Sequence, residues 1–133
     1  MTGRIRTNLR FTFPGGAPLS HGKAQLMELI RETGSIRQAA QRMDMSYRRG
    51  WLLADELNHL FIEPVIATKH GGKSGGGAAL TPFGEELLTR FRAMEARTAE
   101  ALRGDLAWME VNMRVDEAET EAAPASDSDQ PSR

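Results

Sequence analysis

The fold is decided by the stretch T-G-S-I-R-Q-A-A-Q-R-M-D-M-S-Y-R-R-G-W over residues 33–51. Gly34 is typical of the end of a helix, because glycine readily adopts the left-handed conformation found there. Ser35 then offers an N-cap hydroxyl to a short helix over 36–43, whose apolar residues recur at i, i+3, i+4 and i+7. After a break, Ser46 can cap another helix. The stretch therefore predicts two helices joined by a tight turn.

Helical patterns continue on both sides of this stretch. Before it, Ser20 can cap a helix that ends at Gly34, and its apolar face consists of Leu26, Met27, Leu29 and Ile30. After it, a helix from about residue 47 to residue 60 places Trp51 on its apolar side, so we expect Trp51 in the core rather than stacked on a base. A buried pair of alanines, Ala39 and Ala40, would let the two short helices cross closely.

Short β-type runs lie outside these helices. Residues 4–13 alternate between apolar and polar side chains, which predicts a half-buried strand. Residues 65–68 and 78–81 are two further runs, joined by the segment K-H-G-G-K-S-G-G-G over 69–77. Because glycines favour turns, we expect a hairpin with a mobile, basic tip.

A long helix is predicted after the hairpin. Thr81 can cap it, Pro82 occupies the favoured first turn, and the periodic apolar pattern reaches about residue 115. A helix of about 30 residues is about 45 Å long, more than the core of such a small domain needs. The apolar residues could pack within their own domain, but a homodimer interface is the better account of this length. The residues expected there are Leu87, Phe91, Met94, Leu102, Leu106 and Met109.

Composition limits the class of protein. The 133 residues contain no cysteine, so disulfides and cysteine-containing zinc sites are excluded. No apolar run is long enough for a membrane span or a secretory signal, and we expect a cytoplasmic protein. Residues 1–115 are expected to form one domain. Residues 116–133 contain Glu, Ala, Ser, Asp and Pro without large apolar side chains, which predicts a disordered acidic tail.

Charge is unevenly distributed along the chain. The net charge is −1, yet the first 52 residues hold nine Lys and Arg and only three Asp and Glu. Residues 104–133 hold two Lys and Arg and eight Asp and Glu. A basic excess of this size is often only a solvated surface, but it is also compatible with contact to a polyanion such as DNA.

The order of the predicted elements indicates a winged helix-turn-helix, a mainly α fold with a small β-hairpin, completed here by the long C-terminal dimerisation helix. In that fold the helix after the turn enters the DNA major groove, and an arginine in its first turn can bind guanine through two hydrogen bonds. Tyr47 could bind phosphate or pack beneath the first helix. The predicted DNA-binding residues are Ser35, Arg37, Ser46, Tyr47, Arg48, Arg49, Lys69, His70, Lys73 and Ser74.

Four motifs point to a known family. They are T-G-S-I-R-Q-A-A at 33–40, M-S-Y-R-R-G-W at 45–51, E-L-N at 56–58 and G-G-K-S-G-G-G-A-A-L-T-P-F-G at 71–84. Through them, the segment from residue 26 to residue 102 resembles the N-terminal DNA-binding domain of the molybdate-responsive ModE repressors, a branch related to the LysR-type winged helix.

The resemblance implies a homodimeric regulator of transcription that binds double-stranded DNA. It places a recognition helix at residues 46–58 and puts the N-terminal strand and the long helix in the subunit interface. Full-length members also carry C-terminal molybdate-binding modules of β type, for which this chain has no room. We therefore expect a stand-alone DNA-binding domain with no cofactor, to which molybdate sensing is not transferred.

Other functions are less well supported by the residues. Gly72-Lys73-Ser74 matches the end of a phosphate-binding P-loop, but Ala67 replaces its first glycine and three glycines follow where a helix must begin. His21, His59 and His70 do not have the spacing of a metal site. Adjacent carboxylates give no acid-base pair, so we expect no enzyme. The alternative function is a protein-interaction module that docks a partner through the same fold.

Overall fold

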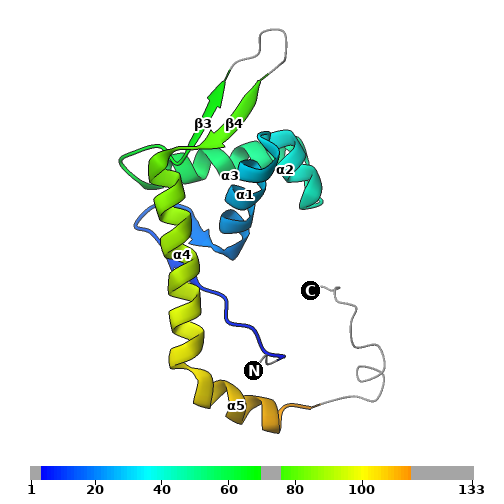
Figure 1. Cartoon of the computed structure of the whole chain (residues 1–133), viewed down its shortest axis with the longest axis vertical. Helices are drawn as coiled ribbons and strands as arrows, with labels where there is room; N and C mark the ends of the chain where they lie inside the picture. The colour runs from blue at the N-terminus through cyan, green and yellow to red at the C-terminus, as the bar shows by residue number, and fades with distance from the viewer. Residues whose placement is uncertain (1–3, 70–75, 115–133) are drawn as a thin grey trace. The chain divides into compact units, whose positions relative to one another are not determined.

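The computed structural model describes residues 4–69 and 76–114. Two compact units are present, one formed by Thr7–Glu100 and the other by the described residues within 1–6 and 101–133. Figure 1 shows the helices within residues 21–60 beneath the hairpin strands of residues 66–69 and 77–80, and the helix from residue 82 begins near the base of that hairpin and runs away from it. In chain order, the elements are β1 (Arg10–Thr12), β2 (Pro18–Ser20), α1 (His21–Thr33), α2 (Ile36–Arg42), α3 (Tyr47–Leu60), β3 (Ile66–Lys69), β4 (Gly77–Leu80), α4 (Pro82–Ala101) and α5 (Arg103–Asn112).

Local capping produces the helix boundaries around the turn. Gly34 adopts a left-handed φ of 72°, and its amide donates to the carbonyl of Ile30 at the end of α1. The Ser35 hydroxyl accepts from the amide of Gln38 at 3.0 Å. The Ser46 hydroxyl accepts from the amide of Arg49, also at 3.0 Å. These three predicted caps are confirmed, because each is decided by residues within four positions of one another.

The close crossing of α2 and α3 depends on two small residues. A Cβ atom built on Gly50 would lie 2.9 Å from Cβ of Ala40, closer than real Cβ contacts. Ala39 and Ala40 are both fully buried. The predicted close approach through the alanine pair is therefore confirmed, with Gly50 as the residue opposite.

The first unit has one hydrophobic core, to which every helix from α1 to α4 and both hairpins contribute. Phe11 of β1 meets Phe91 of α4 edge to face, with ring centroids 6.0 Å apart. The largest fully buried side chains are those of Phe91, Leu26, Met27, Ile30, Leu57 and Val65. Burial of this kind contributes about 25 cal/mol per Å² of apolar surface, and it positions the hairpin against the helices.

The hairpin formed by β3 and β4 is tied to α3 by one side chain. Its antiparallel register pairs Ile66 with Leu80 and Lys69 with Gly77. The carboxamide oxygen of Asn58 accepts from the amides of Val65 at 2.7 Å and Ile66 at 2.9 Å, and its nitrogen donates to the carbonyl of Ile66. Because all three bonds come from α3, the hairpin has a defined position beside that helix.

The N-terminal strand is shorter than residues 4–13. Only Arg10–Thr12 forms a strand, which pairs antiparallel with β2, an element that the sequence did not predict. A strand requires a partner as well as alternation, and the turn containing Gly15, whose φ is 65°, brings only these residues opposite β2. Ser20 consequently ends β2, and its side chain makes no cap hydrogen bond to α1.

The predicted continuous C-terminal helix is divided into two. α4 ends at Ala101, Leu102 has φ −98° and ψ 8°, and α5 begins at Arg103. Gly104 lies next to the break, and glycine is a weak helix former. The prediction of one continuous helix rested on the spacing of apolar residues alone and did not take this glycine into account. Within the second unit, the carboxylate of Glu110 accepts hydrogen bonds from the backbone amides of Arg4 and Ile5.

Two kinds of feature are absent from the described residues. No helix among residues 4–69 and 76–114 is long and apolar enough to cross a membrane. The same residues contain no group of three His, Cys, Asp or Glu side chains arranged to bind a metal ion.

Candidate nucleic-acid interface

The first turn of α3 presents its side chains to solvent. The Ser46 cap starts the helix, and Tyr47, Arg48 and Arg49 follow directly and are all exposed. Neither Arg48 nor Arg49 forms a side-chain hydrogen bond or ion pair with the part of the chain that the structure describes. Both guanidinium groups can therefore bind an external acceptor without first breaking a contact to these residues.

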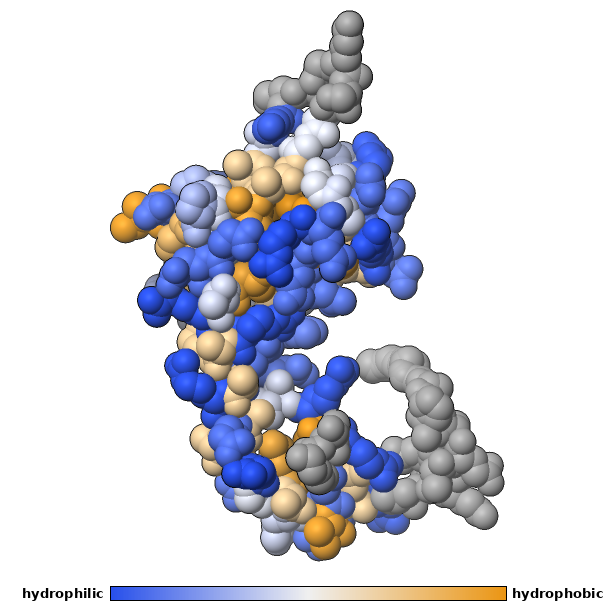
Figure 2. Space-filling view, viewed as in Figure 1, coloured by the Kyte–Doolittle hydropathy of each residue, from blue (hydrophilic) through white to orange (hydrophobic). Residues whose placement is uncertain are grey.

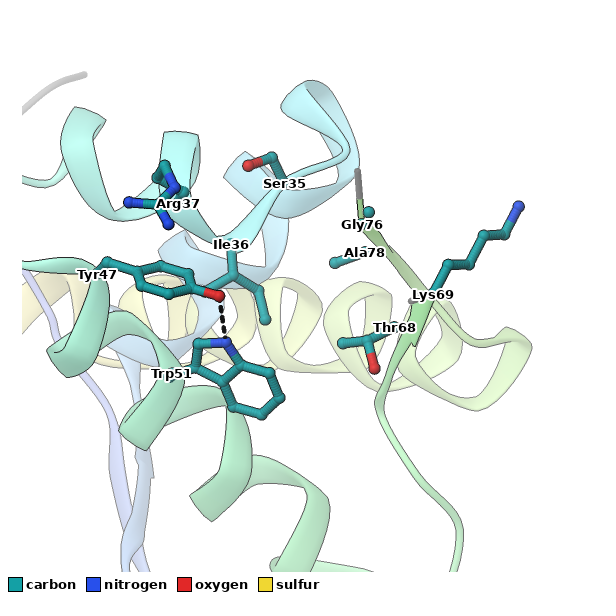
Figure 3. A pocket seen from close by; sticks show the side chains of 10 residues that line it. Ser35, Ile36, Arg37, Tyr47, Trp51, Thr68, Lys69, Gly76 and Ala78 are labelled. Atoms are coloured by element: carbon teal, nitrogen blue, oxygen red, sulfur yellow. Dashed lines mark hydrogen bonds between the residues drawn. The ribbon is translucent and has the colours of Figure 1, made fainter. Parts of the chain in front are cut away.

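A groove of about 280 Å³ lies between the start of α2, the first turns of α3 and the hairpin. Figure 3 shows side chains from these elements around it. None of the lining residues is acidic, whereas two are cationic. The lining residues are Ser35, Ile36, Arg37, Tyr47, Trp51, Thr68, Lys69, Gly76, Gly77 and Ala78.

Three of these side chains, those of Arg37, Tyr47 and Trp51, are linked by direct contacts. The guanidinium carbon of Arg37 lies 4.1 Å from the centroid of the Tyr47 ring, a cation–π contact. The Trp51 indole nitrogen donates to the Tyr47 hydroxyl at 2.7 Å, as the dashed line in Figure 3 shows. Tyr47 is therefore not packed beneath the first helix but lies between Arg37 and Trp51.

Trp51 is not a core residue, contrary to the sequence-based interpretation. Its side chain is 40% exposed and faces the groove. The buried face of α3 is formed by Gly50, Ala54 and Leu57. Gly50 faces Ala40, whereas Trp51 lines the groove together with residues at the start of α2 and in the hairpin. Helical periodicity predicts which residues share a face but not which part of that face the neighbouring helix covers.

Basic residues dominate the surface of α2 and the start of α3. Residues 35–50 contain four arginines and a single acidic residue, Asp44. Arg42 forms an ion pair with Glu32 at 3.1 Å, whereas Arg37 has no ion pair with the described residues. Figure 2 shows a hydrophilic surface over α2. The positive charges of Arg37, Arg48 and Arg49, which no described acidic residue neutralises, favour contact with a polyanion.

The remaining predicted DNA-binding residues differ in burial and in position. Ser35 is half-buried, and its hydroxyl proton stays available because the oxygen accepts from the Gln38 amide. Lys69 is exposed at the end of β3. His70, Lys73 and Ser74 lie outside the described residues. The structure thus brings Ser35, Arg37, Tyr47 and Lys69 to one groove, next to the turn that carries Arg48 and Arg49.

The groove also contains residues that were not predicted as site residues, among them Trp51 and Thr68. The signal for Trp51 was present, because Tyr47 and Trp51 are separated by four positions and therefore share a helix face. For Thr68 the sequence offers no such signal, because its place in the groove depends on the packing of the hairpin.

A separate ionic cluster joins α1 to α4. Arg92 donates to both carboxylate oxygens of Glu28, at 2.9 and 2.8 Å, and to Glu95 at 2.7 Å. The hydrogen bond from Arg92 lowers the pKa of Glu28 below its ordinary value. Hydrogen bonding to Glu28 in turn raises the pKa of Arg92, so both groups stay charged. Glu95 also lies 3.5 Å from His21, and none of these four residues lines the groove.

The predicted dimer residues fall into two groups. Leu87 and Phe91 are buried in the core of the first unit, with 9% and 1% exposure. Both side chains pack against the core within one chain, and their place in a dimer interface stays a prediction. Met94 is partly buried against the same core. Leu102, Leu106 and Met109 lie in the second unit, where Leu102 and Met109 are exposed.

Similar proteins are known from several bacteria, although no family model matches the chain. The molybdenum-pterin-binding protein MopB of Rhodobacter capsulatus is 38% identical over 104 residues, which are 78% of this chain and 37% of MopB. The molybdenum transport protein ModE of Azotobacter vinelandii is 37% identical over 65% of this chain and 32% of its own length.

The DNA-binding transcriptional dual regulator ModE of Escherichia coli K12 is 36% identical over 50% of this chain and 25% of its own length. The names of these relatives describe regulators, transport proteins and binding proteins, not enzymes, in agreement with the expectation of no catalytic activity. The chain spans about a third of the length of the curated relatives it matches. It is thus similar, over part of their length, to ModE transcriptional regulators and to the molybdenum-pterin-binding protein MopB.

Proposed function

We propose that the chain binds duplex DNA and serves as the DNA-binding part of a transcription regulator. The observation that carries this proposal is the first turn of α3, where Arg48 and Arg49 are exposed and unpaired among the described residues. The similarity to a DNA-binding regulator of Escherichia coli supports it. That the chain acts without the molybdate-binding modules stays a prediction.

In this proposal the fold is a winged helix-turn-helix. The α2 and α3 pair forms the helix-turn-helix, and the β3–β4 hairpin is the wing. α3 has 14 residues and is about 21 Å long, and a helix about 10 to 12 Å in diameter fits a major groove about 12 Å wide. Arg48 and Arg49 contact base edges there. Ser46 and Lys69 contact the phosphate backbone, which fixes the position of the helix without reading sequence.

The proposed regulator is a homodimer, with α5 in the subunit interface. This helix carries three exposed large apolar side chains, those of Trp108 at 68%, Met109 at 40% and Val111 at 83% exposure. Figure 2 shows the corresponding apolar surface over α5. A two-fold symmetric dimer would present two copies of α3 to half-sites about one helical turn of DNA apart, or a multiple of it.

Base readout is tested by substitution of Arg48. Arg48→Ala removes a guanidinium that can form two hydrogen bonds to guanine, so we expect a loss of about 1 to 3 kcal/mol on selected sites and a relaxed base preference. Binding sites are selected from a random duplex library, sequenced, and measured by fluorescence anisotropy across a salt series. Arg90→Ala is the matched control, because Arg90 is paired with Glu86 on α4, away from the groove.

The results separate two functions. Sequence-dependent binding that Arg48→Ala weakens and Arg90→Ala does not would support DNA readout by α3. If Arg48→Ala retains both affinity and base preference, α3 is not the recognition helix. Equally feeble binding of the native chain to all duplexes would favour the alternative, a module that docks a protein partner.

A further inference from the structure

We propose that the groove beside α3 holds one phosphodiester of the DNA backbone and that Trp51 is the residue that positions its ligands. This inference rests on the proposed function and adds a second contact to it, independent of base sequence. It follows from three features of the groove. They are its positive charge, a tyrosine hydroxyl that is free to donate a hydrogen bond, and the limited rotamers of its side chains.

The charge of the groove matches an anion. Arg37 at the start of α2 and Lys69 at the end of β3 both line it, and none of the described residues around it is acidic. Arg37 spends none of its five N–H donors on a hydrogen bond to the residues that the structure describes. Its guanidinium lies over the face of the Tyr47 ring, which leaves the edge of the guanidinium open to an acceptor.

The hydrogen bond between Trp51 and Tyr47 gives the tyrosine hydroxyl a direction. An indole N–H can only donate, so at 2.7 Å the Tyr47 oxygen must be the acceptor. The hydroxyl proton is then available to donate, and its oxygen lies within the groove in Figure 3. An exposed tyrosine and an exposed tryptophan arranged in this way present a donor to a phosphate oxygen.

The same contacts restrict the side chains before any ligand binds. Tyr47 is 41% and Trp51 40% exposed, so neither is held in place by deep burial. The indole bond on one side of Tyr47 and the Arg37 guanidinium on the other limit the rotamers that the ring can adopt. Side-chain ordering that precedes binding lowers the entropic cost of the contact. Trp51 therefore acts through Tyr47, as a positioning residue.

The inference is tested with a fluorescein-labelled 30-base-pair duplex of mixed sequence, which needs no known operator. Tyr47→Phe removes the hydroxyl donor, and we expect about tenfold weaker binding with an unchanged salt slope, because no charge is lost. Arg37→Ala is expected to reduce the slope of log affinity against log salt by about 0.9, the value for one phosphate contact. Arg90→Ala again controls for loss of a cation elsewhere.

A double-mutant cycle isolates the role of Trp51. Trp51→Phe keeps an aromatic ring but removes the indole donor, and we expect binding several-fold weaker than that of the native chain. The double variant Tyr47→Phe with Trp51→Phe should bind no more weakly than Tyr47→Phe alone, because the indole acts through the hydroxyl. Losses that multiply in the double variant would show that Trp51 contacts DNA independently and would overturn its positioning role.

A direct readout guards against variants that fail to fold. The chain has two tryptophans, so Trp108→Phe leaves Trp51 as the sole indole. We expect the duplex to shield this indole from acrylamide quenching and to change its emission. Unchanged quenching of Trp51 in the bound complex would overturn the groove assignment.

The outcomes also distinguish this inference from the proposed function. If the native chain binds duplexes and Arg48→Ala weakens binding, while Tyr47→Phe and Trp51→Phe bind as the native chain does, only the groove assignment fails. If the native chain shows no salt-dependent binding to any duplex, both fail together. If the native chain binds single-stranded DNA more tightly than duplex DNA, and Trp51→Phe loses that binding, Trp51 stacks on a base and the groove does not hold a backbone phosphate.

Discussion

At the scale of single residues, Gly84 shows how one missing methyl group makes a close contact possible. A Cβ atom at this position would lie 2.3 Å from the carbonyl oxygen of Val65. That same carbonyl accepts from the amide of Thr81, whose hydroxyl in turn accepts from the amide of Gly84 at 2.9 Å. The start of α4 is therefore fixed against the base of the hairpin by backbone contacts, which cannot move aside as a flexible side chain can.

Gly84→Ala should accordingly destabilise the fold. We expect the free energy of unfolding to fall by about 1 to 3 kcal/mol, because overpacking against backbone outweighs the better helix propensity of alanine. Urea denaturation followed by circular dichroism measures this difference. Gly22→Ala in α1 is the control, since its nearest neighbouring atom lies 4.0 Å from the added Cβ and no loss is expected. Equal stability of both variants would contradict the close approach.

At the scale of elements, the ion pair of Glu28 and Arg92 joins α1 to α4. The pKa of Glu28 is lowered chiefly by its hydrogen bond from Arg92, so the ionised carboxylate is favoured in the folded state. The resulting stabilisation is fully present above the ordinary pKa of 4.5. It is lost as the pH falls from there through the lowered value, because the unfolded state takes up a proton first.

Glu28→Gln tests this linkage. At pH 7 we expect the variant to be about 1 kcal/mol less stable, a modest value because the side chains of Glu28 and Arg92 are 35% and 28% exposed. The difference from the native chain should shrink as the pH is lowered below about 4.5, which denaturation at a series of pH values measures. Glu86→Gln is the control in a more exposed pair. A difference independent of pH would mean that the pair acts through packing alone.

At the scale of the whole molecule, the proposed homodimer depends on α5. Met109→Glu places a charge in an exposed apolar surface, so we expect the dimer to dissociate and affinity for a two-half-site duplex to fall. Sedimentation over a range of concentrations measures the assembly. Ala96→Glu adds the same charge at an exposed position of α4, outside the proposed interface, and should leave the assembly unchanged. A Met109→Glu variant that sediments as the native chain would exclude this face from the interface.

Sequence and tertiary structure decided different things about this protein. The caps at Ser35 and Ser46, the glycine at position 34 and the bounds of α3 follow from contacts within a few positions, so the sequence alone determined them. The exposure of Trp51 in the groove depends on how α3 packs with α2 and the hairpin, and the burial of Phe91 on its contact with Phe11, 80 positions earlier in the chain. Local hydrogen bonds are encoded by neighbouring residues, whereas the side of a helix that faces solvent is decided only when distant elements pack against it.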